Sequence, residues 1–124
     1  AGGSADAVAA GAADTADLAR LAERASLTLG MLIAIAIGLH NFSEGLAIGV
    51  SARAGEVGLA TTLIVGFALH NATEGFGIVG PLGSVRPSWR WLFAAGLIGG
   101  GPTFAGTIVG YRVTSPALEI AFSM

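Results

Sequence analysis

The sequence predicts an all-α protein, a bundle of helices that crosses a membrane several times. The first observation behind this fold class is the composition: 53 % of the 124 residues are hydrophobic, 11 % are charged and the mean hydropathy is +0.75. Ordinary soluble domains contain about 25 % charged residues. The second observation is that the apolar residues gather in long runs, and about 20 helical residues are enough to cross the hydrocarbon core of a bilayer.

The same composition excludes other classes of protein. The net charge of −2 and the small number of cations leave no basic surface for a nucleic acid, so we expect none as a partner. The chain has no cysteine, which excludes disulfides and thiolate metal sites within it. The partner that the composition does predict is the lipid bilayer.

The elements follow in order along the chain. Residues 1–25 are polar and lack the features of a signal peptide, so we expect a polar loop there. Residues 26–124 form the expected transmembrane domain. Its predicted helices cover residues 27–50, 57–82 and 91–111, and a partial fourth helix begins at about residue 116. Because the chain starts without methionine and ends inside an apolar run, we expect a fragment of a longer protein.

Two further features refine the third span and the orientation. Gly99-Gly100-Gly101-Pro102 in the middle of the third span predicts a loosened or kinked helix. Two arginines precede the first span and two lie in the loop 83–90, whereas the two opposite ends have one each. Arginine is enriched in cytoplasmic loops, so we expect residues 1–25 and the loop 83–90 on the cytoplasmic side.

A duplicated polar motif interrupts the first two spans. Residues 39–45 and 69–75 share the pattern Leu-His-Asn-x-x-Glu-Gly at an offset of 30, and they contain the only two histidines of the chain. Ionisable residues inside apolar spans are costly and usually functional. The matching residues are Leu39 and Leu69, His40 and His70, Asn41 and Asn71, Glu44 and Glu74, Gly45 and Gly75, and Ile48 and Ile78.

The motif predicts a divalent-cation site. Residues four apart share one face of a helix, so each histidine lies above its glutamate, and antiparallel packing of the two spans brings both pairs to one depth. Imidazole and carboxylate ligands suit Zn²⁺, Fe²⁺ or Mn²⁺, and the asparagines offer amide oxygens to the same ion or an adjacent one. The candidate metal ligands are His40, Asn41, Glu44, His70, Asn71 and Glu74.

Three other interpretations stay open from the residues alone. A single histidine or asparagine in a membrane helix more often joins helices by hydrogen bonds worth about 0.6 kcal/mol, but two matched motifs favour a metal site. A membrane di-iron carboxylate oxidase also uses paired Glu and His; it requires Glu-x-x-His, whereas this chain has His-x-x-x-Glu. A proton-conducting or purely structural helical module is the third alternative.

The two motifs resemble the signatures of the ZIP (Zrt/Irt-like protein) family of divalent metal transporters. His40-Asn41-Phe42-Ser43-Glu44-Gly45 is similar to the fourth-helix signature of the family and His70-Asn71-Ala72-Thr73-Glu74-Gly75 to the fifth. The stretch Gly-Gly-Gly-Pro-Thr at 99–103 is similar to the sixth helix. The resemblance implies an eight-helix carrier of which this chain holds helices four to six and the start of the seventh.

The resemblance also implies a function. His40, Glu44, His70 and Glu74 would bind the transported metal, with Asn41 assisting, and the protein would not be an enzyme. Ser43 and Thr73 stand where the family usually has proline. Asn71 and Gly101 stand where some members have acidic ligands of a second ion, so we expect one ion. We expect uptake of Zn²⁺ towards the cytoplasm across the plasma (cytoplasmic) membrane, with Fe²⁺, Mn²⁺ or Cd²⁺ as other substrates and a homodimer as a candidate assembly.

Overall fold

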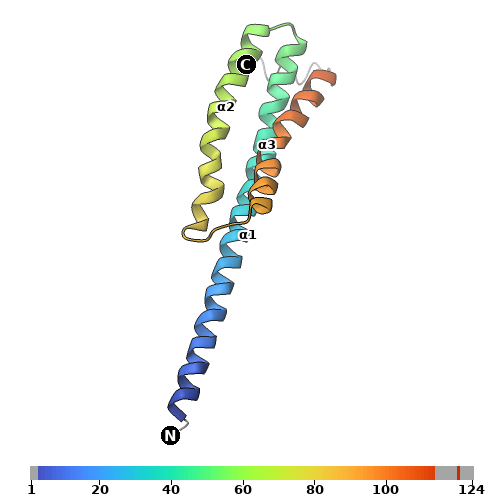
Figure 1. Ribbon diagram of the computed structural model, residues 1–124. Helices are drawn as coiled ribbons and strands as arrows, with labels where there is room; N and C mark the ends of the chain where they lie inside the picture. The colour runs from blue at the N-terminus through green and yellow to red at the C-terminus, as the bar shows by residue number, and fades with distance from the viewer. Residues whose placement is uncertain (1–2, 114–119, 121–124) are drawn as a thin grey trace.

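Three long helices make up the part of the chain that the computed structural model describes, residues 3–113 and Ile120. They are α1 (Gly3–Arg53), α2 (Val57–Val79) and α3 (Trp89–Arg112), and a short 3-10 turn, η1 (Gly80–Leu82), extends α2. The chain runs along α1, returns along α2 and runs along α3 in the direction of α1 (Figure 1). The described residues contain no strand, which confirms the all-α fold class. The partial helix expected from residue 116 lies outside the described residues, apart from Ile120.

The polar segment before the first span is helical, which corrects the loop expected over residues 1–25. Helix α1 begins at Gly3 and continues without a break into the apolar run. Alanine is the commonest residue between Gly3 and Ala25, and it has the highest helix propensity of all residues, so this segment needs no apolar face to be helical. The N-terminal half of α1 extends well beyond α2 and α3 (Figure 1), and its side chains from Asp14 to Ala25 are exposed.

All three helices have the length and hydropathy needed to cross a membrane. The spans with this property are Asp14–Arg53, Val57–Leu82 and Trp89–Arg112. Large apolar side chains such as Leu39, Leu69 and Phe104 point outwards from the bundle and are about 70 % exposed. Such extensive apolar exposure is unfavourable in water and favourable against lipid or further helices. The chain is therefore an integral membrane protein.

The turn between α1 and α2 ends α1 with a Schellman motif. The backbone N–H of Glu56 donates to the carbonyl of Ser51 at 3.1 Å, and the N–H of Gly55 donates to that of Ala52 at 3.3 Å. Gly55 has a φ of 82°, a left-handed conformation that glycine adopts without steric cost. This tight turn makes α1 and α2 antiparallel neighbours, which is what brings the two motifs together.

The contact between α1 and α3 depends on two stripes of glycine with the same spacing. Gly38, Gly45 and Gly49 lie on α1, and Gly99, Gly106 and Gly110 lie on α3. A Cβ atom on Gly45 would collide with the Thr103 carbonyl of α3, and one on Gly106 would collide with the Phe42 carbonyl of α1. Small residues of this kind let membrane helices approach until their backbones touch. Helix α1 thus packs closely along α3 as well as against α2, whereas α2 and α3 barely meet.

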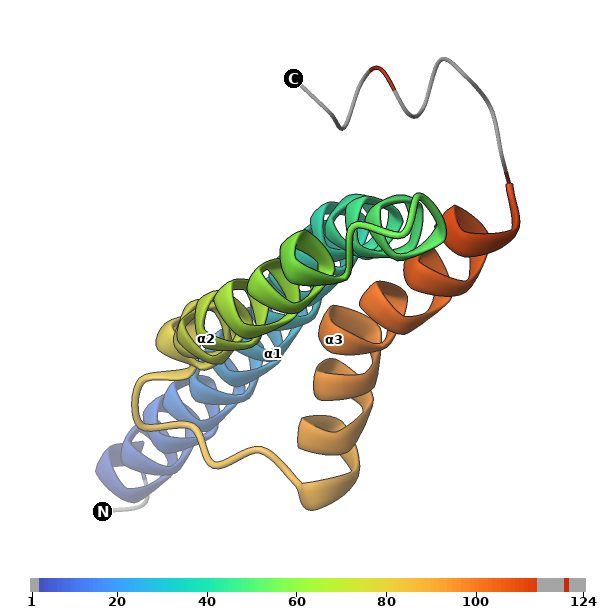
Figure 2. The same ribbon diagram turned by 90° about the horizontal axis from the view of Figure 1, so that it is seen from above.

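Helix α3 changes direction about halfway along its length (Figure 2). Pro102 lies inside the helix, and proline has no N–H to donate to the carbonyl four residues earlier, which is Ile98. A Cβ atom on Gly38 of α1 would meet this Ile98 carbonyl first. The kink that the sequence predicted is present, and the carbonyls next to it face α1.

The glycine contact yields a test of the packing. We expect Gly106→Ala to destabilise the protein by about 1–3 kcal/mol, because the added methyl group overpacks the α1–α3 contact. Gly96→Ala on the same helix is the matched control, since a Cβ atom there has no neighbour within 4 Å. The control should be neutral or stabilising, because alanine favours a helix over glycine by roughly 1 kcal/mol. Thermal unfolding of the full-length protein in detergent measures both, and equal stability of the two variants would contradict the packing.

Candidate metal site

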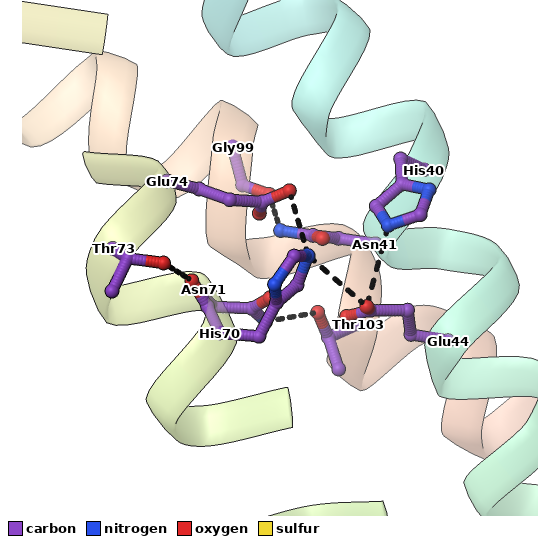
Figure 3. A network of polar contacts seen from close by, with 9 residues as sticks. All are labelled: His40, Asn41, Glu44, His70, Asn71, Thr73, Glu74, Gly99 and Thr103. Carbon is purple, nitrogen blue, oxygen red and sulfur yellow. Dashed lines mark hydrogen bonds and ion pairs between the residues drawn. The ribbon is translucent and has the colours of Figure 1, made fainter. Parts of the chain in front are cut away.

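The four ionisable residues of the duplicated motif meet between α1 and α2. His40 and Glu44 are four residues apart on α1, and His70 and Glu74 are four residues apart on α2, so each pair shares one helix face. The imidazole rings of the two histidines lie edge to face, with centroids 5.8 Å apart. Figure 3 shows both rings directed towards the same carboxylate, that of Glu44.

One oxygen atom is central to the cluster. Oε1 of Glu44 lies 3.3 Å from Nε2 of His40 and 3.7 Å from Nε2 of His70. The Glu44 side chain is only 7 % exposed, whereas the two imidazoles are about half exposed. A buried carboxylate requires partners of opposite charge or hydrogen-bond donors. The two imidazoles are such partners for Glu44.

These distances suit a small divalent cation. Zinc binds imidazole nitrogen and carboxylate oxygen at roughly 2.0–2.2 Å, which places neighbouring ligand atoms of a tetrahedral site roughly 3.3–3.6 Å apart. His40, Glu44 and His70 each offer one ligand atom, and these three atoms lie within 4.8 Å of one another.

Glu74 occupies a more peripheral position than Glu44. Its Oε1 atom lies 3.3 Å from Nε2 of His70, its one ion-pair partner among the described residues, and its side chain is 16 % exposed. The group of potential ligands within 4.8 Å of one another does not include it. The structure therefore brings His40, Glu44 and His70 into one group. Glu74 lies beside this group and contacts it through His70.

The two asparagines lie behind the cluster, towards α3. Asn41 is fully buried, and its Nδ2 atom donates a hydrogen bond of 2.9 Å to the Gly99 carbonyl. The Asn71 amide lies 3.5 Å from the Thr103 hydroxyl (Figure 3). Both asparagines thus connect the first two helices with the bent part of α3.

The residues beside the ligands differ between the two motifs. Ser43 is exposed, whereas the Thr73 hydroxyl donates to the His70 carbonyl at 2.6 Å. A hydroxyl that bonds back to its own helix can bend it, so Thr73 acts on the turn that carries His70. Gly45 is pressed against α3, but a Cβ atom on Gly75 would have no neighbour within 4 Å. The repeat is therefore similar in sequence and different in environment.

Sequence reasoning assigned no site role to two residues of α3 that contact the cluster. The Gly99 carbonyl is the acceptor for Asn41, and the sequence carries no signal for a backbone acceptor of this kind. The Thr103 hydroxyl contacts Asn71, and the sequence does contain a feature that points to Thr103. Thr103 directly follows the proline, and with Thr107 it supplies the hydroxyl groups in the middle of an otherwise apolar span.

Apolar, membrane-spanning helices that carry a cluster of imidazoles and carboxylates around a buried glutamate are typical of one class of protein, the membrane proteins that bind a cation within the bilayer. A comparison with protein families identifies the member of this class. The model of the ZIP zinc transporter family matches residues 6–122, so the chain belongs to that family. Neither the curated proteins nor the solved structures compared with the chain gave a significant match.

Membership of the family determines the broad function. ZIP proteins transport divalent metal ions, and they are transporters rather than enzymes. The family and the His/Glu group together identify the chain as a metal-binding membrane transport protein. The alternative of a di-iron oxidase is therefore set aside.

Proposed function

We propose that the chain carries Zn²⁺ into the cytoplasm and that His40, Glu44, His70 and Glu74 bind the ion in transit. The observation that carries this proposal is the position of Glu44 Oε1, within 3.3 Å of one imidazole nitrogen and 3.7 Å of the other. A cation bound between Glu44 Oε1 and the two imidazole nitrogens would have three ligand atoms around it, with no change in the backbone. Rotation of the Glu74 side chain would add a fourth ligand.

Charge balance supports a divalent substrate. With both imidazoles neutral, Glu44 and Glu74 give the cluster two negative charges, which one divalent cation neutralises. Without a cation, the two carboxylates would lack a compensating charge, and unpaired charges in an apolar environment are costly.

The ligand types favour zinc without excluding its neighbours. Imidazole and carboxylate are ligands of intermediate softness that bind Zn²⁺, Fe²⁺ and Mn²⁺, and the described residues supply no sulfur ligand to the cluster. The separations of 3.3 and 3.7 Å around Glu44 Oε1 are close to the spacing of neighbouring ligand atoms in a tetrahedral Zn²⁺ site. We accordingly propose Zn²⁺ as the main substrate and Fe²⁺, Mn²⁺ and Cd²⁺ as competitors, with one ion bound at a time.

The two glutamates should contribute unequally to metal affinity. We expect Glu44→Gln to raise the Kd for Zn²⁺ more than about 100-fold, beyond the 10- to 100-fold typical of an outer-shell partner. Glu74→Gln should cost less, because Glu74 contacts only one of the imidazoles. Glu23→Gln, an exposed carboxylate on α1, is the charge-matched control. Equilibrium competition against a zinc chelator with the full-length protein measures all three, and equal losses for Glu44→Gln and Glu23→Gln would refute the site.

Transport itself is tested by uptake. Full-length protein in proteoliposomes should take up radioactive zinc, and the double variant His40→Ala/Glu74→Ala should abolish that uptake because it removes one ligand from each helix. Leu39→Ala is the control, since Leu39 lies beside the histidine and points out of the bundle. Uptake that survives the double variant would rule out the proposed path through this cluster. Competition with Fe²⁺, Mn²⁺ and Cd²⁺ then gives the order of preference.

We also propose the orientation and location. The loop after η1 lies next to α1 residues 19–26, so Arg86 and Arg90 are at the same end of the bundle as Arg20 and Arg24. At the other end Arg53 donates to the Tyr111 carbonyl at 3.2 Å. The end with more arginine faces the cytoplasm by the positive-inside rule. The plasma (cytoplasmic) membrane and a homodimeric assembly complete the proposal as predictions from the sequence.

Cysteine labelling tests the orientation, since the described chain contains no cysteine of its own. Ser84 and Ala54 are exposed and lie at opposite ends of α2. In spheroplasts, we expect a membrane-impermeant maleimide to label Ala54→Cys and to leave Ser84→Cys unlabelled until the membrane is opened. The reverse pattern would invert the topology and, with it, the proposed direction of uptake.

A further inference from the structure

A pair of carboxamides fills the space between the His/Glu cluster and the bend of α3. Asn41 is 1 % exposed and is the largest fully buried side chain of the described residues. Its Nδ2 atom donates a hydrogen bond of 2.9 Å to the Gly99 carbonyl, so its Oδ1 atom faces the opposite direction, towards α2. The residue on α2 that meets it is Asn71.

The hydrogen-bond partners of Asn71 determine the orientation of its amide. In one orientation Nδ2 makes only a long contact of 3.5 Å with the Thr103 hydroxyl. In the other, Nδ2 has three acceptors within hydrogen-bond distance of its two N–H groups: Glu44 Oε2 at 3.1 Å, the Phe67 carbonyl at 3.2 Å and Asn41 Oδ1 at 3.3 Å. The amide oxygen then faces the Thr103 hydroxyl. The second orientation satisfies both ends of the amide, and amide orientation is assigned by this criterion.

We propose that Asn41 and Asn71 are positioning residues, which hold Glu44 through a carboxamide relay and do not bind the transported ion themselves. The relay runs from the Gly99 carbonyl through Asn41 and Asn71 to Oε2 of Glu44. It rests on the proposed function, because its purpose is to orient a ligand of the transported cation. It also narrows the ligand set expected from the sequence, in which both asparagines were metal ligands.

The chemistry of the amide group excludes the two asparagines from the metal in this arrangement. An asparagine binds a cation through its carbonyl oxygen, because the NH₂ group has hydrogens to donate and no lone pair to offer. Oδ1 of Asn41 already accepts from Asn71, and Oδ1 of Asn71 faces Thr103. The group that Asn71 directs at Glu44 is its NH₂, a donor. The NH₂ group of Asn71 thus contacts both Asn41 Oδ1 and the Glu44 carboxylate, while the Asn71 oxygen faces α3.

The relay gives the two oxygens of Glu44 different roles. Oε2 accepts from Asn71, while Oε1 faces the imidazoles of His40 and His70. A hydrogen bond to one oxygen fixes the rotation of the carboxylate, so the other oxygen stays directed at the site of the ion. Partners of this outer-shell kind typically change metal affinity 10- to 100-fold when they are removed.

The far end of the relay is anchored where α3 bends. Pro102 has no N–H for the Ile98 carbonyl, and Asn41 donates to the next carbonyl along the helix, that of Gly99. Gly38, three residues before Asn41 on α1, lies against the Ile98 carbonyl. The position of Asn41, and through it that of Glu44, is therefore determined by the bent part of α3.

Cobalt spectroscopy separates a positioning role from a ligand role. We expect Asn71→Leu in the full-length protein to raise the Kd for Co²⁺ by 10- to 100-fold and to leave the visible absorption spectrum of the saturated site unchanged, because the ligand set is unchanged. A changed spectrum at saturation would mean that Asn71 is a ligand and would overturn the proposal. An unchanged Kd would overturn it as well.

A milder substitution tests the relay even if Asn71→Leu does not fold. Thr103→Val removes the hydroxyl that faces Asn71 and keeps the side-chain volume, so we expect a smaller rise in Kd of up to about tenfold. Thr107→Val is the matched control one turn further on, since its hydroxyl donates only to the Thr103 carbonyl. Equal effects of the two valine variants would mean that local packing and not the relay is responsible, and would count against the proposal.

A measurement without metal keeps this proposal separate from the proposed function. The antisymmetric carboxylate band of Glu44 is the infrared band that disappears in Glu44→Gln. In metal-free protein we expect this band to shift in Asn71→Leu and to stay in place in Thr107→Val. A band that does not shift overturns the relay. If the wild type binds no Co²⁺ but the band shifts, the relay stands and the assignment of a metal site fails.

Discussion

The arrangement of the three helices depends on one constraint, the burial of a carboxylate in an apolar environment. Glu44 is nearly inaccessible to solvent in a segment that crosses a membrane. A charge in such a place persists only when surrounding groups compensate for it. Both oxygens of Glu44 have partners: imidazole nitrogens for Oε1 and the Asn71 amide for Oε2. The cluster is thus the point at which the polar groups of α1 and α2 satisfy one another.

The glycine stripes make this compensation possible. Gly45 directly follows Glu44 and lies against the backbone of α3, so α1 can approach α3 closely enough for Asn41 to reach the Gly99 carbonyl. A larger residue in place of Gly45 would separate the two helices and leave that amide without its acceptor. The spacing of seven and then four residues, shared by both helices, keeps the contact on one face along about three turns. Packing and polar chemistry are therefore coupled in the same few residues.

The sequence predicted the spans, the kink and the meeting of the two motifs, because these follow from hydropathy, from a proline and from the antiparallel return of the chain. It did not predict the helix at residues 3–25, because the expected helices were placed by their apolar runs. Alanine raises helix propensity without forming such a run. It also could not distinguish the roles of His40 and Asn41, which are adjacent in sequence. About 100° of helical rotation directs His40 towards α2 and Asn41 towards α3, and only the packing of all three helices shows which neighbour each one meets.

The two copies of the motif are not equivalent, and their inequality has a consequence for a carrier. Helix α1 contacts both α2 and α3, and Glu44 pairs with imidazoles from two helices, whereas the ion-pair partner of Glu74 among the described residues is His70 of its own helix. In the proposed site Glu44, with more partners, would be the fixed ligand, and Glu74 would be the one that rotates towards the ion or away from it. A site with four fixed ligands would bind its ion tightly and release it slowly. A site with fixed and movable ligands can lose one of its bonds without disassembly of the rest, which lowers the barrier to release while Glu44 keeps the cluster in position for the next ion.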